Sequence, residues 1–219
     1  MSVTECRLPL GQAEVYAERL REALMPACDD ILIVGSVRRR KVDVGDVELA
    51  ILPKFDPAST DLFGGAVDER VPGYTHLDRA IASLVASDVL VRAGLDGPRQ
   101  KAFTLGRAAR DCGFKVELFI AQGRGNWGNT VAIRTGPTEM NIALVTAWNR
   151  GGLLPDFLCH RDGWLRWGGP GRSTVFECPT ERHFFNYVKL PCIAPRKRTP
   201  EIVGVLRSGR YDVDELEAE

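Results

Sequence analysis

A glycine-serine corner followed by a strand with two carboxylates constrains this chain more than any other feature. Residues 34–41 read Val-Gly-Ser-Val-Arg-Arg-Arg-Lys, and residues 44–51 read Val-Gly-Asp-Val-Glu-Leu-Ala-Ile. Side chains alternate along a strand, so Asp46 and Glu48 share one face and the intervening apolar residues share the other. Neighbouring carboxylates repel each other unless a cation lies between them, and a Gly-Ser turn offers backbone N–H groups to an anion. The stretch predicts a site for a cation and a polyphosphate, the chemistry of nucleotidyl transfer.

Composition is that of an ordinary globular protein. The 219 residues are 44% hydrophobic and 26% charged, and 29 basic residues balance 29 acidic ones. A zero net charge supplies no general attraction to nucleic acid, so such binding must rest on local patches. The six cysteines and three histidines lack zinc-ligand spacing and the density of a secreted disulfide scaffold. We expect a soluble, cytoplasmic protein with reduced thiols, no membrane span and no obligate protein partner.

Hydrophobic periodicity predicts alternating helices and strands. Helical spacing occurs at residues 12–24, 75–85, 127–133, 137–149 and 180–188. Strand-like runs occur at residues 31–34, 46–52, 89–93, 100–105 and 114–121, with a hairpin at 154–167 and a loop at 53–73. Glu117 lies on the strand 114–121, whose opposite face is apolar. Three carboxylates converge if this strand lies beside the one that carries Asp46 and Glu48.

Several motifs recur in the order found in one family. The chain has Gly-Ser-Val-Arg-Arg at 35–39, Gly-Asp-Val-Glu at 45–48, Lys-Val-Glu at 115–117, Ile-Arg-Thr-Gly at 133–136 before Asn141, and Lys-Leu-Pro-Cys-Ile-Ala-Pro-x-x-Arg at 189–198. Over about residues 10–200 it therefore resembles the palm and thumb of X-family DNA polymerases, the polymerase β type, within the nucleotidyltransferase superfamily. Two of the family's three aspartates are glutamates here, and its Tyr-Phe pair is Ile133-Arg134.

The resemblance implies an α/β (α+β) fold with two domains. The expected palm, a nucleotidyltransferase domain with a mixed β-sheet flanked by helices, covers residues 1–125. A small α+β thumb covers residues 126–205, and residues 206–219 are expected to form an acidic, mobile C-terminal tail. The implied activity is that of a minimal DNA polymerase, with a place in DNA repair. It would add nucleotides to a DNA 3′-hydroxyl by two-metal phosphoryl transfer. Its implied partners are two Mg²⁺ or Mn²⁺ ions, a nucleoside triphosphate (a dNTP), and a DNA primer end or gapped DNA.

The resemblance also implies residue roles. The catalytic metal ligands would be Asp46, Glu48 and Glu117. The nucleotide would meet Gly35, Ser36, Arg39, Gly45, Thr135, Gly136 and Asn141: Ser36, Arg39 and the Gly45 backbone at the β and γ phosphates, and Asn141 at the base. DNA would meet Lys115, Arg134 and Arg198.

Two alternatives remain open. One is a template-independent nucleotidyltransferase that modifies RNA, a protein or a small molecule, which the neutral charge favours because a polymerase gains affinity from phosphate neutralisation. The other is a catalytically weakened DNA-end-binding module whose glutamate-substituted site no longer assembles two ions.

Overall fold

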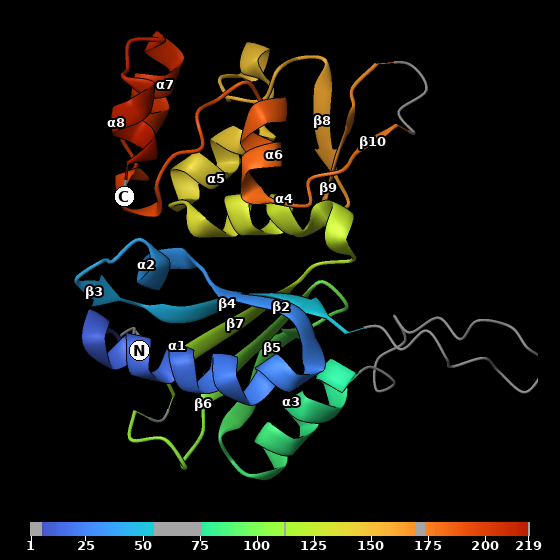
Figure 1. Cartoon of the computed structure of the whole chain (residues 1–219). Helices are drawn as coiled ribbons and strands as arrows, with labels where there is room; N and C mark the ends of the chain where they lie inside the picture. Colours follow the sequence, from blue (N-terminus) through green and yellow to red (C-terminus); the bar gives the residue numbers. More distant parts are fainter. Residues whose placement is uncertain (1–5, 55–75, 112, 170–173, 219) are drawn as a thin grey trace, which may run out of the picture. The chain divides into compact units, whose positions relative to one another are not determined.

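The chain is divided into two compact units. The computed structural model describes residues 6–54, 76–111, 113–169 and 174–218. Unit 1 consists of Met1–Ile33 and Val42–Ile120, and unit 2 consists of Val34–Lys41 and Ala121–Glu219 (Figure 1). The chain thus leaves unit 1 at residue 33, returns at 42 and leaves again after 120. The Gly-Ser corner consequently belongs to unit 2, whereas Asp46 and Glu48 belong to unit 1.

Unit 1 is built on a mixed sheet, which has five strands within the described residues. Its order is β2-β4-β7-β6-β5. The pair β4·β7 is parallel, and the other neighbouring pairs are antiparallel. The strands are β2 (Cys28–Ile33), β4 (Asp46–Pro53), β5 (Leu90–Asp96), β6 (Gln100–Leu105) and β7 (Lys115–Ile120), and a short antiparallel pair joins β1 (Leu8–Pro9) to β3 (Asp43–Val44). The predicted carboxylates lie on the central strand β7 and on its neighbour β4.

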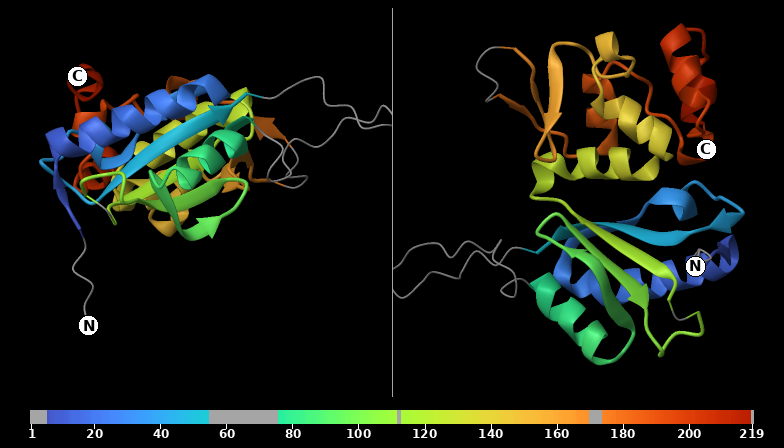
Figure 2. Two further views of the ribbon diagram at one scale, coloured as in Figure 1. Left: turned by 90° about the horizontal axis from the view of Figure 1, so that it is seen from below. Right: turned by 180° about the vertical axis from the view of Figure 1, so that it is seen from behind.

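Helices cover one face of this sheet. Figure 2 shows α1 (Leu10–Leu24) and α3 (His76–Ala86) on the same side, with the 3₁₀ turn η1 (Met25–Ala27) ending the first helix. The buried residues of α1 are Ala13, Ala17, Leu20 and Leu24, the spacing of one helix face. On the sheet, the β4 residues Val47, Leu49 and Ile51 are fully buried. The predicted mixed sheet flanked by helices is confirmed.

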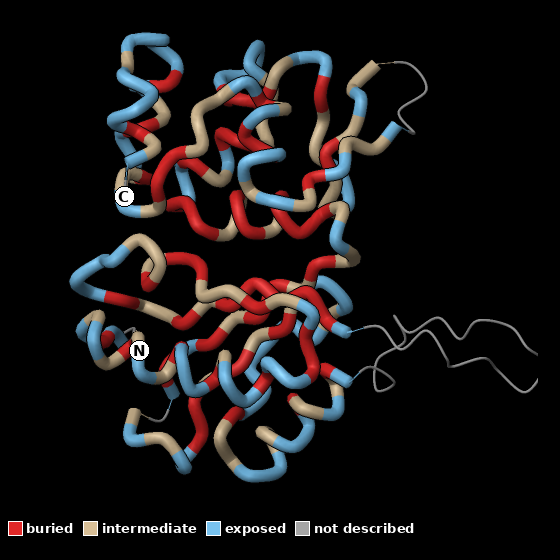
Figure 3. Tube along the Cα trace, viewed as in Figure 1, coloured by how far each residue is buried: buried red, intermediate tan, exposed pale blue. Residues whose placement is uncertain are grey.

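Unit 2 has its own core, formed by helices and a small antiparallel sheet. Its buried residues come from most of its elements, as the red segments of the tube in Figure 3 show. The elements are α2 (Gly35–Arg38), α4 (Arg124–Thr135), α5 (Thr138–Val145), η2 (Trp148–Arg150), β8 (Leu158–Arg161), β9 (Trp164–Trp167), β10 (Val175–Phe176), α6 (Glu181–Tyr187), η3 (Pro195–Lys197), α7 (Ile202–Ser208) and α8 (Val213–Glu217). The predicted hairpin is present, with Asp162 and Gly163 as its two turn residues, both at positive φ.

Three expectations for unit 2 are wrong. Helix α4 continues to Thr135 instead of breaking at Arg134, and the next helix ends at Val145 rather than near residue 149. The expected mobile tail instead carries α8. The carboxylate of Asp212 accepts hydrogen bonds from the backbone N–H groups of the first turn, and Leu216 is buried in the unit 2 core. A capped helix with an apolar anchor is ordered despite its acidic composition.

Parts of the prediction concern residues outside those described. Most of the loop at 53–73 and the first residue of the helix predicted at 75–85 fall there. None of the helices that are described combines the length and apolar character needed to cross a bilayer.

Candidate active site

The strand register brings the three predicted carboxylates together on unit 1. Strands β4 and β7 run parallel, and Glu48 is the direct partner of Glu117, while Asp46 is the partner of Lys115. Directly paired residues point to the same face of a sheet. All three acidic side chains are partly exposed, whereas the residues between them, Val47 and Val116, are fully buried. Asp46, Glu48 and Glu117 therefore share the face opposite to that apolar layer.

The spacing of these carboxylates follows from sheet geometry. Neighbouring strands lie about 4.8 Å apart, and residues two apart along a strand lie roughly 6.6 Å apart. Within the described residues, no three His, Cys, Asp or Glu side chains are clustered closely enough to hold a metal ion as they stand. Glu48 and Glu117 have longer and more rotatable side chains than Asp46, and carboxylates within one group repel each other. As a donor set, three carboxylates suit Mg²⁺ or Mn²⁺.

The structure adds Gln100 as a neighbour of the three carboxylates, a contact that the sequence analysis did not predict. It lies on β6 beside β7, and its side-chain amide donates to the Glu117 carboxylate across 3.4 Å. A neutral amide can hold the carboxylate in place without cancelling its charge. Only the antiparallel register of β6 against β7 reveals this contact, because no motif links the two residues.

The predicted nucleotide residues other than Gly45 fall in unit 2, around the end of α4. Arg39 donates from Nη1 to the backbone carbonyl of Thr135, at 2.6 Å. The Thr135 hydroxyl accepts from Arg38 at 2.6 Å and donates to the Val131 carbonyl at 2.7 Å. Thr135 is fully buried, so both its carbonyl and its hydroxyl fix arginines of the basic run. A direct nucleotide contact by the Thr135 side chain is therefore not supported.

Among the predicted nucleotide residues, two buried side-chain oxygens have no hydrogen-bond partner within the part of the chain that the structure describes. They are Oγ of Ser36 and Oδ1 of Asn141. Buried polar groups are normally paired, and exceptions call for an explanation such as a ligand. Gly136 lies next to Asn141, where an added Cβ would stand 2.7 Å from that Oδ1. The glycine thus keeps open the space beside the unpaired amide oxygen.

A partly buried ion-pair network holds the first arginine of the basic run in place. Glu181 binds Arg38 and Arg198, each through a nitrogen–oxygen distance of 2.7 Å. Burial alone would raise the pKa of Glu181, but Arg198 and then Arg38 outweigh it, so its pKa lies below the ordinary value. Arg38 and Glu181 were not among the predicted site residues. Neither Arg38, as one arginine in a basic run, nor Glu181, as the first residue of a helix, can be recognised from the sequence as part of an ion pair.

The expected DNA contact by Arg198 is wrong. Its side chain is only 1% exposed, and it donates to the Ile193 carbonyl at 2.7 and 3.0 Å. A guanidinium enclosed in this way anchors the segment around η3 and cannot meet a DNA phosphate. Of the other two residues expected to contact DNA, Lys115 is exposed and Arg134 is partly exposed.

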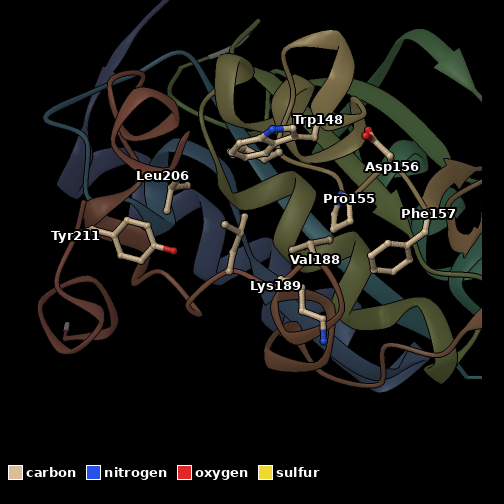
Figure 4. Close-up of a pocket in the computed structure, with 10 residues that line it drawn as sticks. Trp148, Pro155, Asp156, Phe157, Val188, Lys189, Leu206 and Tyr211 are labelled. Atoms are coloured by element: carbon tan, nitrogen blue, oxygen red, sulfur yellow. The ribbon is translucent and has the colours of Figure 1, made fainter. Parts of the chain in front are cut away.

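Unit 2 also has a mainly apolar pocket with a volume of about 480 Å³. In Figure 4, Trp148, Phe157 and Tyr211 surround it, with Val188 and Leu206 between them. Arg207 already covers one ring of Trp148, with its guanidinium carbon 4.6 Å from the ring centre. None of the predicted site residues lines this pocket.

Comparison with known proteins finds solved structures with a similar fold. No family model matches the chain, and no curated protein matches its sequence. Two solved structures of Leishmania infantum polymerase beta do match, each with a TM-score of 0.66. The ternary P/T complex is 18% identical and the match covers 89% of this chain and 77% of that one. The ternary gap complex is 17% identical, with coverages of 89% and 71%.

The chain has the polymerase β fold. The match covers 89% of the chain, and the expected X-family resemblance is confirmed at the level of structure. The identity is low, so the likeness concerns the arrangement of the backbone. The chemistry must be argued from the side chains of this chain.

Proposed function

We propose that the chain is a divalent-metal-dependent nucleotidyltransferase, and that it extends a DNA 3′-hydroxyl with nucleotides from a triphosphate. The observation that carries the proposal is the pairing of Glu48 with Glu117 across the parallel strands β4 and β7, with Asp46 on the same face. Three carboxylates gathered on one sheet face form an oxygen donor set of the kind that Mg²⁺ or Mn²⁺ prefers. The fold supports the same activity, because the two solved structures that share it are ternary complexes of a polymerase beta, one described as a P/T complex and one as a gap complex.

In this proposal Asp46, Glu48 and Glu117 hold two Mg²⁺ or Mn²⁺ ions. Bound ions would lower the pKa of the attacking hydroxyl and neutralise charge on the attacking and leaving oxygens. The carboxylates orient the reacting groups, and the Gln100 amide donates a long hydrogen bond, 3.4 Å, to Glu117. Lys115, the partner of Asp46 across the strands, supplies a positive charge for a phosphate near the primer end.

The nucleotide is assigned to polar groups of unit 2. Arg39 is held by the Thr135 carbonyl, so its guanidinium is preorganised to bind a phosphate. The unpartnered Oγ of Ser36 provides a further hydrogen bond for a phosphate, and the unpartnered Oδ1 of Asn141 provides an acceptor for a base amino group. The Gly35 and Gly45 backbones are assigned to the triphosphate and Gly136 to the nucleotide, as the resemblance implies.

The alternative acceptors keep this chemistry and change only the substrate. A net charge of zero favours an acceptor that is not a long nucleic-acid strand, such as a protein or a small molecule. A weakened DNA-end-binding module would retain the fold and lose metal-dependent nucleotide binding.

One assay distinguishes these functions. Labelled dNTPs and NTPs are offered, with Mg²⁺ or Mn²⁺, to single-stranded, primed and gapped DNA, and extension is read on a gel. The proposal predicts extension of primed or gapped DNA. No extension of any DNA, with coupled binding of Mn²⁺ and a non-hydrolysable nucleotide retained, favours the alternative acceptors. No transfer, together with no coupled binding of Mn²⁺ and a non-hydrolysable nucleotide by calorimetry, favours the binding module.

The matched variants are Asp46→Asn and Asp43→Asn. Asp43 is exposed and lies on β3, outside the three-carboxylate group. A metal that stabilises transition-state charge contributes several kcal/mol, and about 1.4 kcal/mol corresponds to a tenfold change in rate. We therefore expect Asp46→Asn to lower the rate of nucleotide transfer by roughly a hundredfold or more, while its circular dichroism spectrum shows an intact fold. Asp43→Asn should retain activity. Full activity of Asp46→Asn would refute the assignment.

A further inference from the structure

A small basic pocket lies on unit 2, apart from the groups assigned to the nucleotide. It has a volume of about 170 Å³ and is lined by Arg38, Arg40, Ala194, Pro195 and Arg196. Three of its five lining residues are arginines, contributed by two segments about 150 residues apart in the sequence. A water molecule occupies about 30 Å³ of liquid, so the pocket has room for a phosphate group.

The charge around this pocket is strongly unbalanced. Glu181 is shared by Arg38 and Arg198, so one carboxylate serves two guanidinium groups. Arg196 is exposed and makes no hydrogen bond or ion pair with any part of the chain that the structure describes. Arginine remains protonated at any physiological pH. The pocket therefore has an excess of positive charge at its mouth.

Both segments that form the pocket have fixed backbones. Arg40 has a φ of 61°, a left-handed conformation that costs energy for a residue with a side chain. On the opposite side, Pro195 begins the 3₁₀ turn η3, and buried Arg198 ties that turn to the Ile193 carbonyl. Strained or tightly held backbone is retained where the surroundings impose it, and such positions are concentrated at binding sites. The arginine side chains thus extend from rigid supports.

We infer that this pocket binds a phosphate group of a DNA strand. Arginine's planar guanidinium matches phosphate oxygens in two-point hydrogen bonding. Arg38 is held by Glu181, so the phosphate is assigned to Arg40 and Arg196, which line the same small volume. The inference that the pocket binds an anion depends only on the residues that line it. The choice of DNA as the source of the phosphate rests on the proposed function.

The test is DNA binding by an Arg196→Ala variant, measured by fluorescence anisotropy in EDTA and without nucleotide. The control is Arg210→Ala, which removes the same charge from an exposed arginine that does not line the pocket. Loss of one phosphate contact lowers the slope of log affinity against log salt by roughly 0.7 for single strands and 0.9 for duplex DNA. We expect Arg196→Ala to show this change, with affinity reduced roughly three- to tenfold near 0.1 M salt, and Arg210→Ala to show neither.

The oligonucleotides are compared with a 5′-phosphate and with a 5′-hydroxyl. An effect of Arg196→Ala restricted to the phosphorylated ends identifies a terminal phosphate, and an equal effect on both identifies a phosphate within the strand. An unchanged salt slope, or an equal loss in Arg210→Ala, would overturn the inference. If Arg196→Ala weakens binding of inorganic phosphate by titration calorimetry but leaves DNA binding unaltered, DNA is ruled out as the occupant.

Failure of this inference is distinct from failure of the proposed function. The binding assay requires no transfer, so it can be performed on Asp46→Asn as well as on the unchanged chain. Full activity in Asp46→Asn would refute the metal assignment and leave the anion pocket standing. An inert Arg196→Ala would refute the pocket and leave the metal assignment standing.

Discussion

Replacing Glu181 with glutamine removes one negative charge from between two guanidinium groups and leaves the side-chain shape almost unchanged. Arg198 is 1% exposed, and Glu181 is its ion-pair partner at 2.7 Å. Without that charge, Arg198 is left as a buried cation that retains its hydrogen bonds to the Ile193 carbonyl and its contact with the Phe185 ring, with no ion-pair partner among the described residues. Breaking a buried pair on one side costs about 3–5 kcal/mol. For a chain of this size, each kcal/mol lowers Tm by about 2–4 °C.

The measurement is urea unfolding of Glu181→Gln at neutral pH, beside Glu18→Gln as a control. Glu18 also forms an ion pair with an arginine, Arg21, but that pair is exposed and three residues apart on α1. Such pairs contribute about 0.2–0.5 kcal/mol. We expect Glu181→Gln to lose several times more stability than Glu18→Gln. Equal losses for the two variants would show that the unit 2 network does not depend on the Glu181 charge.

The same variant makes a prediction about acid stability. The pKa of Glu181 is lowered from 4.5, since the attraction of Arg198 and Arg38 outweighs burial. Below that ordinary value the unfolded chain binds a proton that the folded chain does not, so stability falls as the pH decreases through the folded pKa. Glutamine cannot titrate. The acid-induced loss of stability in Glu181→Gln should therefore be shallower below about pH 5 than in the unchanged chain, and an identical slope would contradict the network.

The remaining predictions concern two glycines and a histidine. Gly136→Ala should destabilise by about 1–3 kcal/mol in urea, because the added Cβ stands 2.7 Å from Asn141 Oδ1. Gly204→Ala, at an exposed position of α7 with nothing within 4 Å of the added Cβ, should stabilise by about 0.5–1 kcal/mol. Burial, and then Arg134, lower the pKa of His160 from 6.5 to about 4. Its NMR titration should follow that value, and its contribution to stability should decline as the pH falls from 6.5 to 4, because only the unfolded chain binds the proton there.

The carboxylate group could be predicted because its signal is local and periodic. Asp46 and Glu48 are two residues apart within an apolar strand, and Glu117 occupies the same phase of another. Period-two alternation decides the face of each strand before any pairing is known. What the sequence left open was whether the strands are neighbours. The parallel register of β4 against β7, with Glu48 opposite Glu117, supplies that step.

The ion-pair network was not predictable in the same way. Arg38 and Glu181 are 143 residues apart, and neither lies in a periodic pattern that would reveal a partner. Arg198 stands in a basic triplet, which usually marks a solvated surface. Buried arginines are rare unless they are paired, so only the position of Glu181 explains why this one lies inside. The assignment of Arg198 to DNA failed because the pattern records charge and not burial.

The run Arg38–Lys41 shows why a cluster of like charges is a coarse predictor of function. Residues 35–38 form the one-turn helix α2, and successive side chains of a helix point about 100° apart. Arg38 is thereby directed to Glu181 and Arg39 to the Thr135 carbonyl, while a positive φ turns the chain at Arg40 toward the basic pocket. Arg38 is thus held by Glu181 at the edge of the basic pocket, Arg39 contacts the Thr135 carbonyl beside the predicted nucleotide residues, and Arg40 lines the basic pocket. Substituting Arg39 tests the nucleotide assignment, whereas substituting Arg40 tests the basic pocket.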